Sequence, residues 1–217
     1  MKYISLNDEL AAYLGQSHSQ VGDDLLMQLQ KRTLELGDIH GMQISPEQGT
    51  LLSLLAALCN AKIAVEVGTF TGYSALCIAR SLAPGGKLHC FDMSDEWTRI
   101  GREFWQKAGV ENKIELHLGD AHQTLANWSA PGEVDFVFVD ADKSGYDFYF
   151  ETLLPRMRRG ALMIFDNTLR DGHAAKPRED NDDDQAIHAL NAKLARDPRV
   201  QTVLLPLADG VTLCRVV

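Results

Sequence analysis

The stretch that decides the fold is residues 62–80, KIAVEVGTFTGYSALCIAR. It begins with an apolar, β-branched run at 63–67, interrupted only by Glu66, which predicts a strand buried on both faces. Gly68 and Gly72 bracket a tight turn, and the residues after it have helical character. A glycine turn between a buried strand and a helix presents free backbone N–H groups to a polar or anionic ligand. The stretch therefore predicts a ligand site at this turn.

The turn reads Gly-x-x-x-Gly and lacks the third glycine of the dinucleotide-binding pattern Gly-x-Gly-x-x-Gly. That pattern brings the backbone against a pyrophosphate, which a ligand such as S-adenosylmethionine does not contain. Glycine turns also end strands for structural reasons alone, so the turn by itself leaves both readings open.

Outward from this unit, short apolar runs alternate with helical patterns. The expected strands are 62–67, 87–91, 113–118, 134–139 and 161–165, and the expected helices are about 72–82, 95–108, 121–128, 145–158 and 183–196. This alternation predicts an α/β fold with a doubly wound, Rossmann-like, mostly parallel sheet. Two further apolar runs, 200–205 and 211–217, flank a Pro- and Gly-containing turn and predict a C-terminal antiparallel hairpin.

The N-terminal part is expected to form helices at 5–14 and 20–36, followed by a loop at 37–44. Ser45-Pro46-Glu47-Gln48 then predicts a helix start, with Ser45 as N-cap and Gln48 completing a capping box. We interpret 1–217 as one domain with a helical extension at 1–44. Because the extension could pack against a second subunit, we expect a homodimer.

The bulk composition excludes several classes of protein. No run approaches the roughly 18 apolar residues that span a bilayer, and the N-terminus lacks a signal-peptide pattern, so we expect no membrane segment and a cytoplasmic location. The four cysteines are scattered in apolar segments, which is typical of core thiols. A net charge of −9 argues against a broad nucleic-acid surface, because such a surface needs a basic face.

Four successive expected strands are followed by an aspartate: Asp92, Asp120, Asp140 and Asp166. The carboxyl ends of parallel strands meet at one edge of a sheet, and ligands bind there. Asp92 lies 20 residues after Gly72, the spacing of a ribose-binding acid, and Asp120 suits the adenine end. The alternative is that each aspartate only caps the helix that follows.

Asp140, Asp166 and Asn167 provide two carboxylates and an amide oxygen at adjacent strand ends. This all-oxygen set fits Mg²⁺, and no His/Cys cluster at zinc spacing is present in the sequence. Lys143 follows Asp140 by three residues and is a candidate general base beside a cation. The alternative for Lys143 is a solvated lysine at a helix start.

The motifs at 65–74 (VEVGTFTGYS), 139–143 (VDADK) and 165–167 (FDN) resemble the cation-dependent S-adenosylmethionine O-methyltransferases. This family includes catechol and caffeoyl-CoA O-methyltransferases and small bacterial relatives. The segments 42–49 and 209–213 match as well, so the similarity extends from about residue 42 to the end.

The resemblance implies that Lys143 is the general base and that Asp140, Asp166 and Asn167 hold Mg²⁺, or another divalent cation such as Mn²⁺ or Ca²⁺. The residues implied in S-adenosylmethionine binding are Met42, Ile44, Glu66, Gly68, Ser74, Asp92, Met93, Ala121 and Asp140. For Met93 the alternative is an ordinary apolar filler. The implied reaction is methyl transfer to one hydroxyl of a small aromatic vicinal diol.

The chain departs from the family pattern after Asn167. Many relatives continue with Val-Leu-Trp, whereas this chain has Thr168-Leu169-Arg170. The resemblance therefore implies that a positively charged side chain replaces an aromatic one at the mouth of the substrate site. The polar stretch at 171–184 is interpreted as a substrate lid. Its alternative is a solvated loop before an Asp-rich helix N-terminus.

Three other functions are compatible with parts of the sequence. Methylation of a hydroxylated nucleoside in tRNA would keep every residue role, and the arginines at 156, 158, 159 and 170 could form a local basic patch for it. An NAD-dependent oxidoreductase is disfavoured by the missing third glycine. A non-catalytic cofactor-binding subunit is disfavoured because the metal set and Lys143 are intact.

Overall fold

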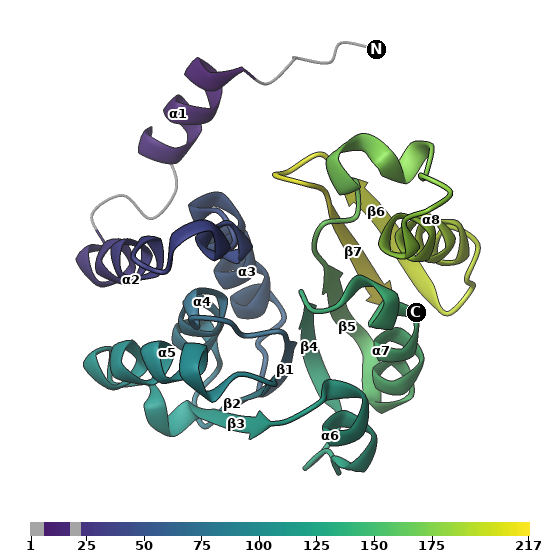
Figure 1. The fold of residues 1–217 in the computed structure, drawn as a ribbon. Helices are drawn as coiled ribbons and strands as arrows, with labels where there is room; N and C mark the ends of the chain where they lie inside the picture. The colour runs from purple at the N-terminus through teal and green to yellow at the C-terminus, as the bar shows by residue number, and fades with distance from the viewer. Residues whose placement is uncertain (1–6, 18–22) are drawn as a thin grey trace.

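The computed structural model describes residues 7–17 and 23–217, and their strands form one seven-stranded sheet (Figure 1). The strands are β1 (Ile63–Val67), β2 (Lys87–Asp92), β3 (Ile114–Leu118), β4 (Val134–Val139), β5 (Met157–Phe165), β6 (Val200–Leu205) and β7 (Val211–Val216). Their order in the sheet is β3-β2-β1-β4-β5-β7-β6.

The first five strands are parallel, and the chain direction across the sheet reverses at β1. β1 pairs with β2 on one side and with β4 on the other, so Val67 is the register partner of both Phe91 and Val139. The predicted doubly wound sheet is therefore confirmed, with its switch point between β1 and β4. The predicted C-terminal hairpin is confirmed too, since β7 runs antiparallel to both β5 and β6.

Helices cover both faces of the sheet (Figure 1). They are α1 (Asp8–Ser17), α2 (Asp24–Leu34), α3 (Pro46–Leu58), α4 (Tyr73–Ser81), α5 (Asp95–Lys107), α6 (Ala121–Asn127), α7 (Tyr146–Leu153) and α8 (Asp182–Leu194). Strand residues alternate between two apolar clusters, because successive side chains point to opposite faces. Ala64 packs with α2–α5, whereas Val65 and Val67 pack with α6–α8.

Two of the predicted boundaries are wrong. The helix expected at 145–158 begins after a short 3₁₀ turn, η3 (Lys143–Gly145), and ends at Leu153. Pro155 lies in a second 3₁₀ turn, η4 (Leu154–Arg156), because proline lacks the N–H that would continue the helix. As a result β5 begins at Met157 rather than at residue 161, with an irregularity in its pairing to β4 between Val134 and Phe136.

The N-terminal helices are shifted from the expected positions, and residues 5–6 and 20–22 of those predictions lie outside the described part of the chain. The expected loop at 37–44 contains a 3₁₀ helix, η1 (Gly37–Met42). The predicted capping box is confirmed: the Ser45 hydroxyl accepts from Gln48 N–H, and Gln48 Oε1 accepts from Ser45 N–H. Among the residues described, no helix is long and apolar enough to cross a membrane.

Candidate active site

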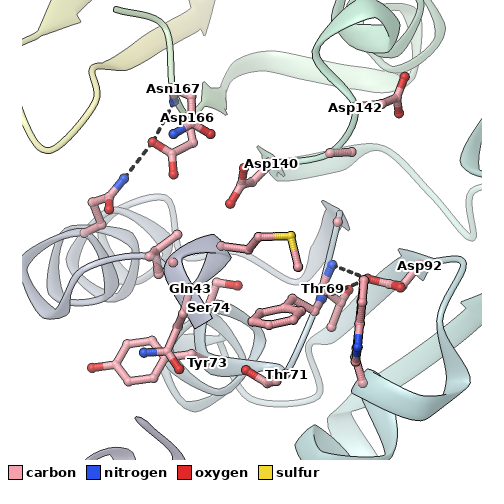
Figure 2. Close-up of a pocket in the computed structure, with 18 of the residues that line it drawn as sticks. Gln43, Thr69, Thr71, Tyr73, Ser74, Asp92, Asp140, Asp142, Asp166 and Asn167 are labelled. Carbon is pink, nitrogen blue, oxygen red and sulfur yellow. Dashed lines mark hydrogen bonds between the residues drawn. The ribbon is translucent and has the colours of Figure 1, made fainter. Parts of the chain in front are cut away.

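A cleft of about 1030 Å³ opens at the carboxyl ends of β1, β2, β4 and β5 (Figure 2). It lies at the switch point, where the loops after β1 and β4 lead to opposite faces of the sheet and leave a crevice between them. Segments 41–46, 68–74, 91–93, 120–122, 140–143 and 166–170 all contribute lining residues. The four aspartates at or just after the carboxyl ends of β2, β3, β4 and β5 thus all line one cleft, as the aspartate pattern predicted.

Of the nine residues expected to hold the cofactor, eight line this cleft: Met42, Ile44, Gly68, Ser74, Asp92, Met93, Ala121 and Asp140. The ninth, Glu66, does not, because it is fully buried on β1 beneath the glycine turn. The three expected metal ligands and Lys143 also line the cleft. The fold therefore brings all of these residues except Glu66 to one cleft. Their contacts with a cofactor or a metal ion stay predictions.

The glycine turn after β1 has no room for larger residues. Gly68 has φ +86°, and a Cβ placed on it would lie 2.0 Å from the carbonyl oxygen of Asp140. Gly72 has φ +79° and starts α4, with the Trp105 indole N–H donating to its carbonyl at 3.1 Å. Only glycine fits both positions, so the backbone of the turn can approach a ligand closely.

Asp92, the expected ribose-binding acid, is held by three backbone donors. Its Oδ2 accepts from the N–H groups of Thr69 and Phe70 at 2.8 Å each, and its Oδ1 accepts from Ser94 N–H at 2.7 Å. These bonds tie the end of β2 to the glycine turn of β1 (Figure 2). The carboxylate is therefore oriented before a ligand arrives.

The residues expected at the two ends of the cofactor differ in exposure. Met93, next to Asp92, lines the cleft and is 77% exposed. Ala121 begins α6, and Asp120 caps that helix by accepting from His122 N–H at 2.9 Å. For Asp120 the capping alternative is thus observed. At the opposite end Ile44 is buried, whereas Met42 is half-exposed.

Glu66 has a buried carboxylate with few partners. Its Oε2 accepts a weak bond from the Cys90 thiol at 3.4 Å, and its Oε1 has no hydrogen-bond partner among the described residues. Burial raises the pKa of Glu66 to about 7. An orphaned acceptor directly below the glycine turn fits a ligand that carries a donor, such as the amino group of S-adenosylmethionine.

Asp140 and Asp166 point into the same space at the other end of the cleft (Figure 2). Asp166 Oδ1 accepts from Gln48 Nε2 and from Asn167 N–H, both at 2.7 Å, so Oδ2 is the oxygen placed to hold a ligand. Burial and the neighbouring Asp140 carboxylate raise the pKa of Asp166 to about 7. Two acids that repel each other in a buried site fit a bound divalent cation, which would relieve the repulsion.

Asn167 completes this group in an unusual backbone conformation, with φ +52°. Its Nδ2 donates to Asp209 Oδ2 at 3.4 Å, which directs the amide oxygen away from Asp209 and makes it available as a ligand. Two carboxylates and an amide oxygen match Mg²⁺, Mn²⁺ or Ca²⁺. The residues therefore fit the expected cation.

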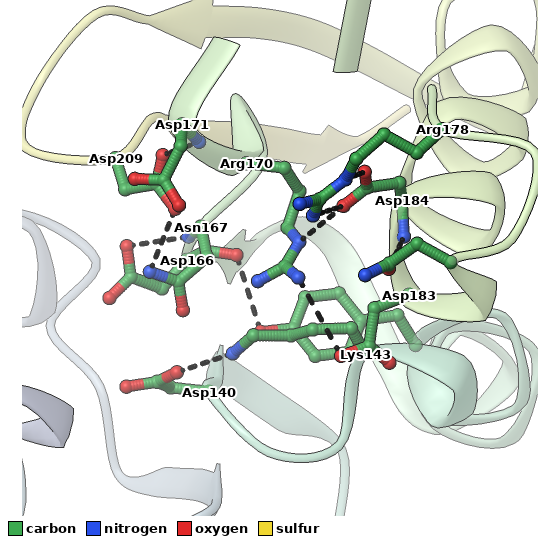
Figure 3. A network of polar contacts seen from close by, with 12 residues as sticks. Asp140, Lys143, Asp166, Asn167, Arg170, Asp171, Arg178, Asp183, Asp184 and Asp209 are labelled. Atoms are coloured by element: carbon green, nitrogen blue, oxygen red, sulfur yellow. Dashed lines mark hydrogen bonds and ion pairs between the residues drawn. The ribbon is translucent and has the colours of Figure 1, made fainter. Parts of the chain in front are cut away.

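Lys143 lies beside the expected metal ligands and is hydrogen-bonded to one of them, Asp140 (Figure 3). Its Nζ donates to Asp140 Oδ1 and to Tyr146 Oη, both at 2.8 Å, and Tyr146 Oη donates to the Asp166 carbonyl at 3.2 Å. Burial raises the pKa of Tyr146 well above its usual value, so the phenol stays protonated. The predicted base is thus positioned by a side chain that the sequence reasoning missed.

Sequence reasoning missed three contributors to the site: Gln48, Tyr146 and Asp209. Gln48 was recognised only as a capping residue, yet its amide serves the cap through Oε1 and Asp166 through Nε2. Asp209 also accepts from Asp171 N–H at 2.6 Å, which anchors the segment after Asn167. The contact of Tyr146 with Lys143 is local, at a spacing of three residues, whereas the bonds of Gln48 and Tyr146 to Asp166 depend on a residue distant in the chain.

Arg170 lies in the cleft wall, as its position after Asn167 suggested (Figure 3). Its guanidinium is 3.5 Å from Asp184 and 3.7 Å from Asp183. Asp184 is fully buried, and Arg178 donates to both of its oxygens, which lowers its pKa to about 2. The predicted lid segment thus contains a 3₁₀ turn, η5 (Arg170–Ala175), and is tied to the start of α8.

The arginines suggested as a basic patch do not gather at the cleft. Arg156, Arg158 and Arg159 lie at the start of β5, whereas the cleft lies at its end. Arg156 donates to the carbonyls of Leu125 and Trp128, and Arg158 is paired with Asp135 at 2.5 Å. Only Arg170 of the four lines the cleft.

The comparisons with known proteins agree with this geometry. A family model described as O-methyltransferase matches residues 16–217. "Probable caffeoyl-CoA O-methyltransferase 2" of Dictyostelium discoideum is 40% identical over 200 residues, covering 90% of this chain and 87% of that protein.

Two solved structures extend the comparison to the bound cofactor. The O-methyltransferase of Bacillus cereus in complex with SAH has a TM-score of 0.87 at 27% identity, covering 96% of this chain and 97% of that one. TomG of Streptomyces achromogenes, involved in tomaymycin synthesis and solved in complex with SAM, has a TM-score of 0.84 at 29% identity, covering 96% of each chain. The chain therefore belongs to the O-methyltransferase family and is an S-adenosylmethionine-dependent O-methyltransferase.

Proposed function

We propose that this enzyme methylates one hydroxyl of a small aromatic vicinal diol and that Asp140, Asp166 and Asn167 hold the divalent cation it needs. The observation that carries the proposal is the joint placement of this all-oxygen set and Lys143 at one end of the cleft. The other end of the same cleft has the glycine turn and Asp92, which are suited to a nucleoside.

When bound, the cation would fix both oxygens of the diol and lower the pKa of a hydroxyl. Lys143, in its neutral form, can accept the hydroxyl proton at Nζ, which Asp140 and Tyr146 hold in place. Tyr146 stays a phenol and anchors the lysine to the backbone of Asp166. Holding the base, the diol and the methyl donor in one fixed arrangement would supply much of the rate.

The polar groups proposed to hold the cofactor are backbone N–H groups of the glycine turn and the carboxylates of Asp92 and Glu66. The ribose hydroxyls of S-adenosylmethionine would donate to the Asp92 carboxylate, whose own geometry the Thr69 and Phe70 N–H groups fix. The amino-acid tail would lie near Gly68, above the unpaired Oε1 of Glu66. The carboxylate oxygens of Asp92 and Glu66 together suit a cofactor with several N–H and O–H donors.

The diol class is supported by the Dictyostelium relative, which is named for caffeoyl-CoA. A caffeoyl group carries two adjacent ring hydroxyls, the arrangement that a cation with two open positions can hold.

The experiment is a methylation assay on catechol, caffeate, caffeoyl-CoA and a flavonoid with adjacent hydroxyls, each with and without chelator. We expect turnover on at least one diol, its loss with chelator and its return with Mg²⁺, Mn²⁺ or Ca²⁺. Turnover that chelator leaves unchanged would exclude the cation, and failure on every diol would exclude the substrate class.

Methylation of a tRNA nucleoside is the second candidate, and the position of the arginines speaks against it. Three of the four lie at the opposite end of β5 from the cleft, so they do not extend a basic surface toward the site. Adding unmodified and hydroxylated tRNA to the same assay separates the diol substrate from the tRNA substrate. The assay is run at low salt, because phosphate contacts make tRNA binding weaken steeply as salt rises.

A further inference from the structure

A cluster of two imidazoles and one carboxylate lies outside the cleft, on the β2–β3 edge of the sheet. His89 on β2 is the register partner of Glu115 on β3, and His117 follows Glu115 by two residues. Residues two apart on a strand share a face, so the three side chains project to the same side. The sequence showed no zinc-spaced cluster, because the residues meet only through the pairing of two strands.

The separations between the three polar groups suit one metal ion. His89 Nδ1 lies 3.3 Å from His117 Nε2, and each of these nitrogens lies 3.7 Å from an oxygen of Glu115. A tetrahedral ion with metal–ligand distances of 2.0–2.2 Å places its ligand atoms about 3.4 Å apart. The two nitrogens, which share a hydrogen bond that an ion would replace, already have this spacing. The two 3.7 Å contacts involve different oxygens of Glu115, so its exposed side chain would have to rotate to bring one oxygen to both nitrogens.

The two imidazoles are held firmly, whereas the carboxylate is free to move. His89 is 4% exposed and lies 5.0 Å from the Trp128 ring, and the His117 ring stacks on Phe91 at 4.6 Å. The Glu115 side chain is 59% exposed, which leaves an entry path from solvent. Two packed imidazoles and one exposed carboxylate form a site that an ion could enter from solvent without rearranging the sheet.

We propose that His89, Glu115 and His117 form a second cation site, selective for a borderline-soft divalent ion such as Zn²⁺. Two nitrogens and one oxygen suit Zn²⁺, Co²⁺, Ni²⁺ or Cu²⁺, whereas the oxygen-only set in the cleft suits Mg²⁺. Burial lowers the pKa of both histidines, so both are neutral and able to ligate at neutral pH. The ion would clamp the edge strand β3 to β2.

The affinity of this site has a structural limit. A metal-binding imidazole usually donates its second N–H to an acceptor, but His89 Nε2 is buried without a partner in the described part of the chain. We therefore expect binding weaker by about 10–100-fold than at a zinc site with such a partner. At a free Zn²⁺ concentration of about 100 times the dissociation constant, binding should still raise the Tm of the protein by about 5–10 °C.

The test measures Zn²⁺ binding by calorimetry and the visible spectrum of Co²⁺ on the untagged chain, with excess Mg²⁺ present to fill the oxygen-lined site. We expect one Zn²⁺ per chain and a tetrahedral Co²⁺ spectrum. His117→Ala should abolish both, and Glu115→Gln should weaken Zn²⁺ binding by about tenfold or more. Because Glu115 is exposed, its variant keeps the fold even if His117→Ala does not.

Two further variants provide the controls. His188→Gln removes an exposed histidine on α8, and Asp166→Asn alters the cleft, so neither should change Zn²⁺ stoichiometry. The proposal is overturned if the wild-type chain binds no Zn²⁺ with a dissociation constant below about 100 µM. It is equally overturned if Glu115→Gln binds as tightly as wild type, or if Asp166→Asn alone removes the ion.

Discussion

Gln48 Nε2 donates to Asp166 Oδ1 at 2.7 Å and so joins the first turn of α3 to the end of β5. The two residues are 118 positions apart in the chain. The same Gln48 amide accepts from the Ser45 N–H through Oε1, so one side chain both caps a helix and orients a candidate metal ligand. The cap fixes the rotamer from which the Nε2 donor reaches Asp166.

Replacing Gln48 with Leu should lower kcat by about 10–100-fold, because Asp166 loses the donor that orients its carboxylate. The cation concentration for half-maximal rate should rise in parallel. Ser45→Ala is the matched control, since it removes the other half of the capping box and costs about 1 kcal/mol of stability without touching Asp166. Steady-state kinetics against cation concentration would contradict this role if both variants lost rate equally.

Replacing Lys143 with Met should lower kcat by about 10²–10⁴-fold, because the variant lacks the proposed proton acceptor. Affinity for S-adenosylhomocysteine, measured by calorimetry, should change little, since Lys143 contacts the metal end of the cleft. Lys31→Ala, an exposed lysine on α2, serves as the control and should retain full rate. Normal turnover of the methionine variant at neutral pH would show that Lys143 is not the base.

Replacing Arg170 with Met should reduce the preference for diols that carry a carboxylate over neutral catechol. The guanidinium lines the cleft and is only loosely paired, at 3.5 Å from Asp184 and 3.7 Å from Asp183, so it can bind a substrate anion. A hydrogen bond to a charged group is worth about 1.5–3 kcal/mol, or roughly 10–100-fold in the ratio of kcat/KM values. Comparing the two substrates within each variant cancels any general loss of activity, and an unchanged ratio would show that Arg170 does not select substrates.

Replacing Glu66 with Gln should stabilise the free enzyme more at alkaline than at acid pH. The pKa of Glu66 is about 7 in the folded chain, above the ordinary value of 4.5, so the folded state binds the proton more tightly than the unfolded chain. Stability therefore falls as pH rises from about 4.5 to 7, by up to about 3 kcal/mol in total, and a neutral amide avoids this loss.

Urea unfolding of both proteins between about pH 5 and pH 8 would measure the effect of Glu66 on stability. The gap between the two free energies should widen toward pH 8 and nearly close at pH 5. A gap of constant size would mean that Glu66 titrates normally. Weaker binding of S-adenosylhomocysteine by the glutamine variant would in addition support the predicted contact of Glu66 with the cofactor.

The expected homodimer can be tested directly by size-exclusion chromatography with light scattering. Leu54 and Leu58 on α3 are 58% and 80% exposed, and such apolar side chains on one helix are typical of surfaces that another subunit covers. The wild-type chain should elute at about twice the mass of one chain, and Leu58→Asp should shift it toward the monomer. A monomeric mass for wild type at micromolar concentration would reject the dimer.

Much of this molecule follows from local sequence signals. The β-branched run ending at Val67, the glycines at 68 and 72, and an aspartate after each of four strands specify the parallel sheet and one functional edge. Lys143 was identified for the same reason, since its distance from Asp140 is set by one turn of chain. Strand periodicity, glycine conformation and helix capping act over a few residues, so a sequence displays them directly.

The tertiary structure alone decided which distant side chains meet. Strand order brought Asp140 beside Asp166, packing of α3 on the sheet brought Gln48 to Asp166, and pairing of β2 with β3 brought His89 to Glu115. It also placed Arg158 at the wrong end of β5 for a basic patch at the cleft. Such contacts depend on register and helix packing across the whole sheet, and a change of one residue in register would turn each side chain to the opposite face.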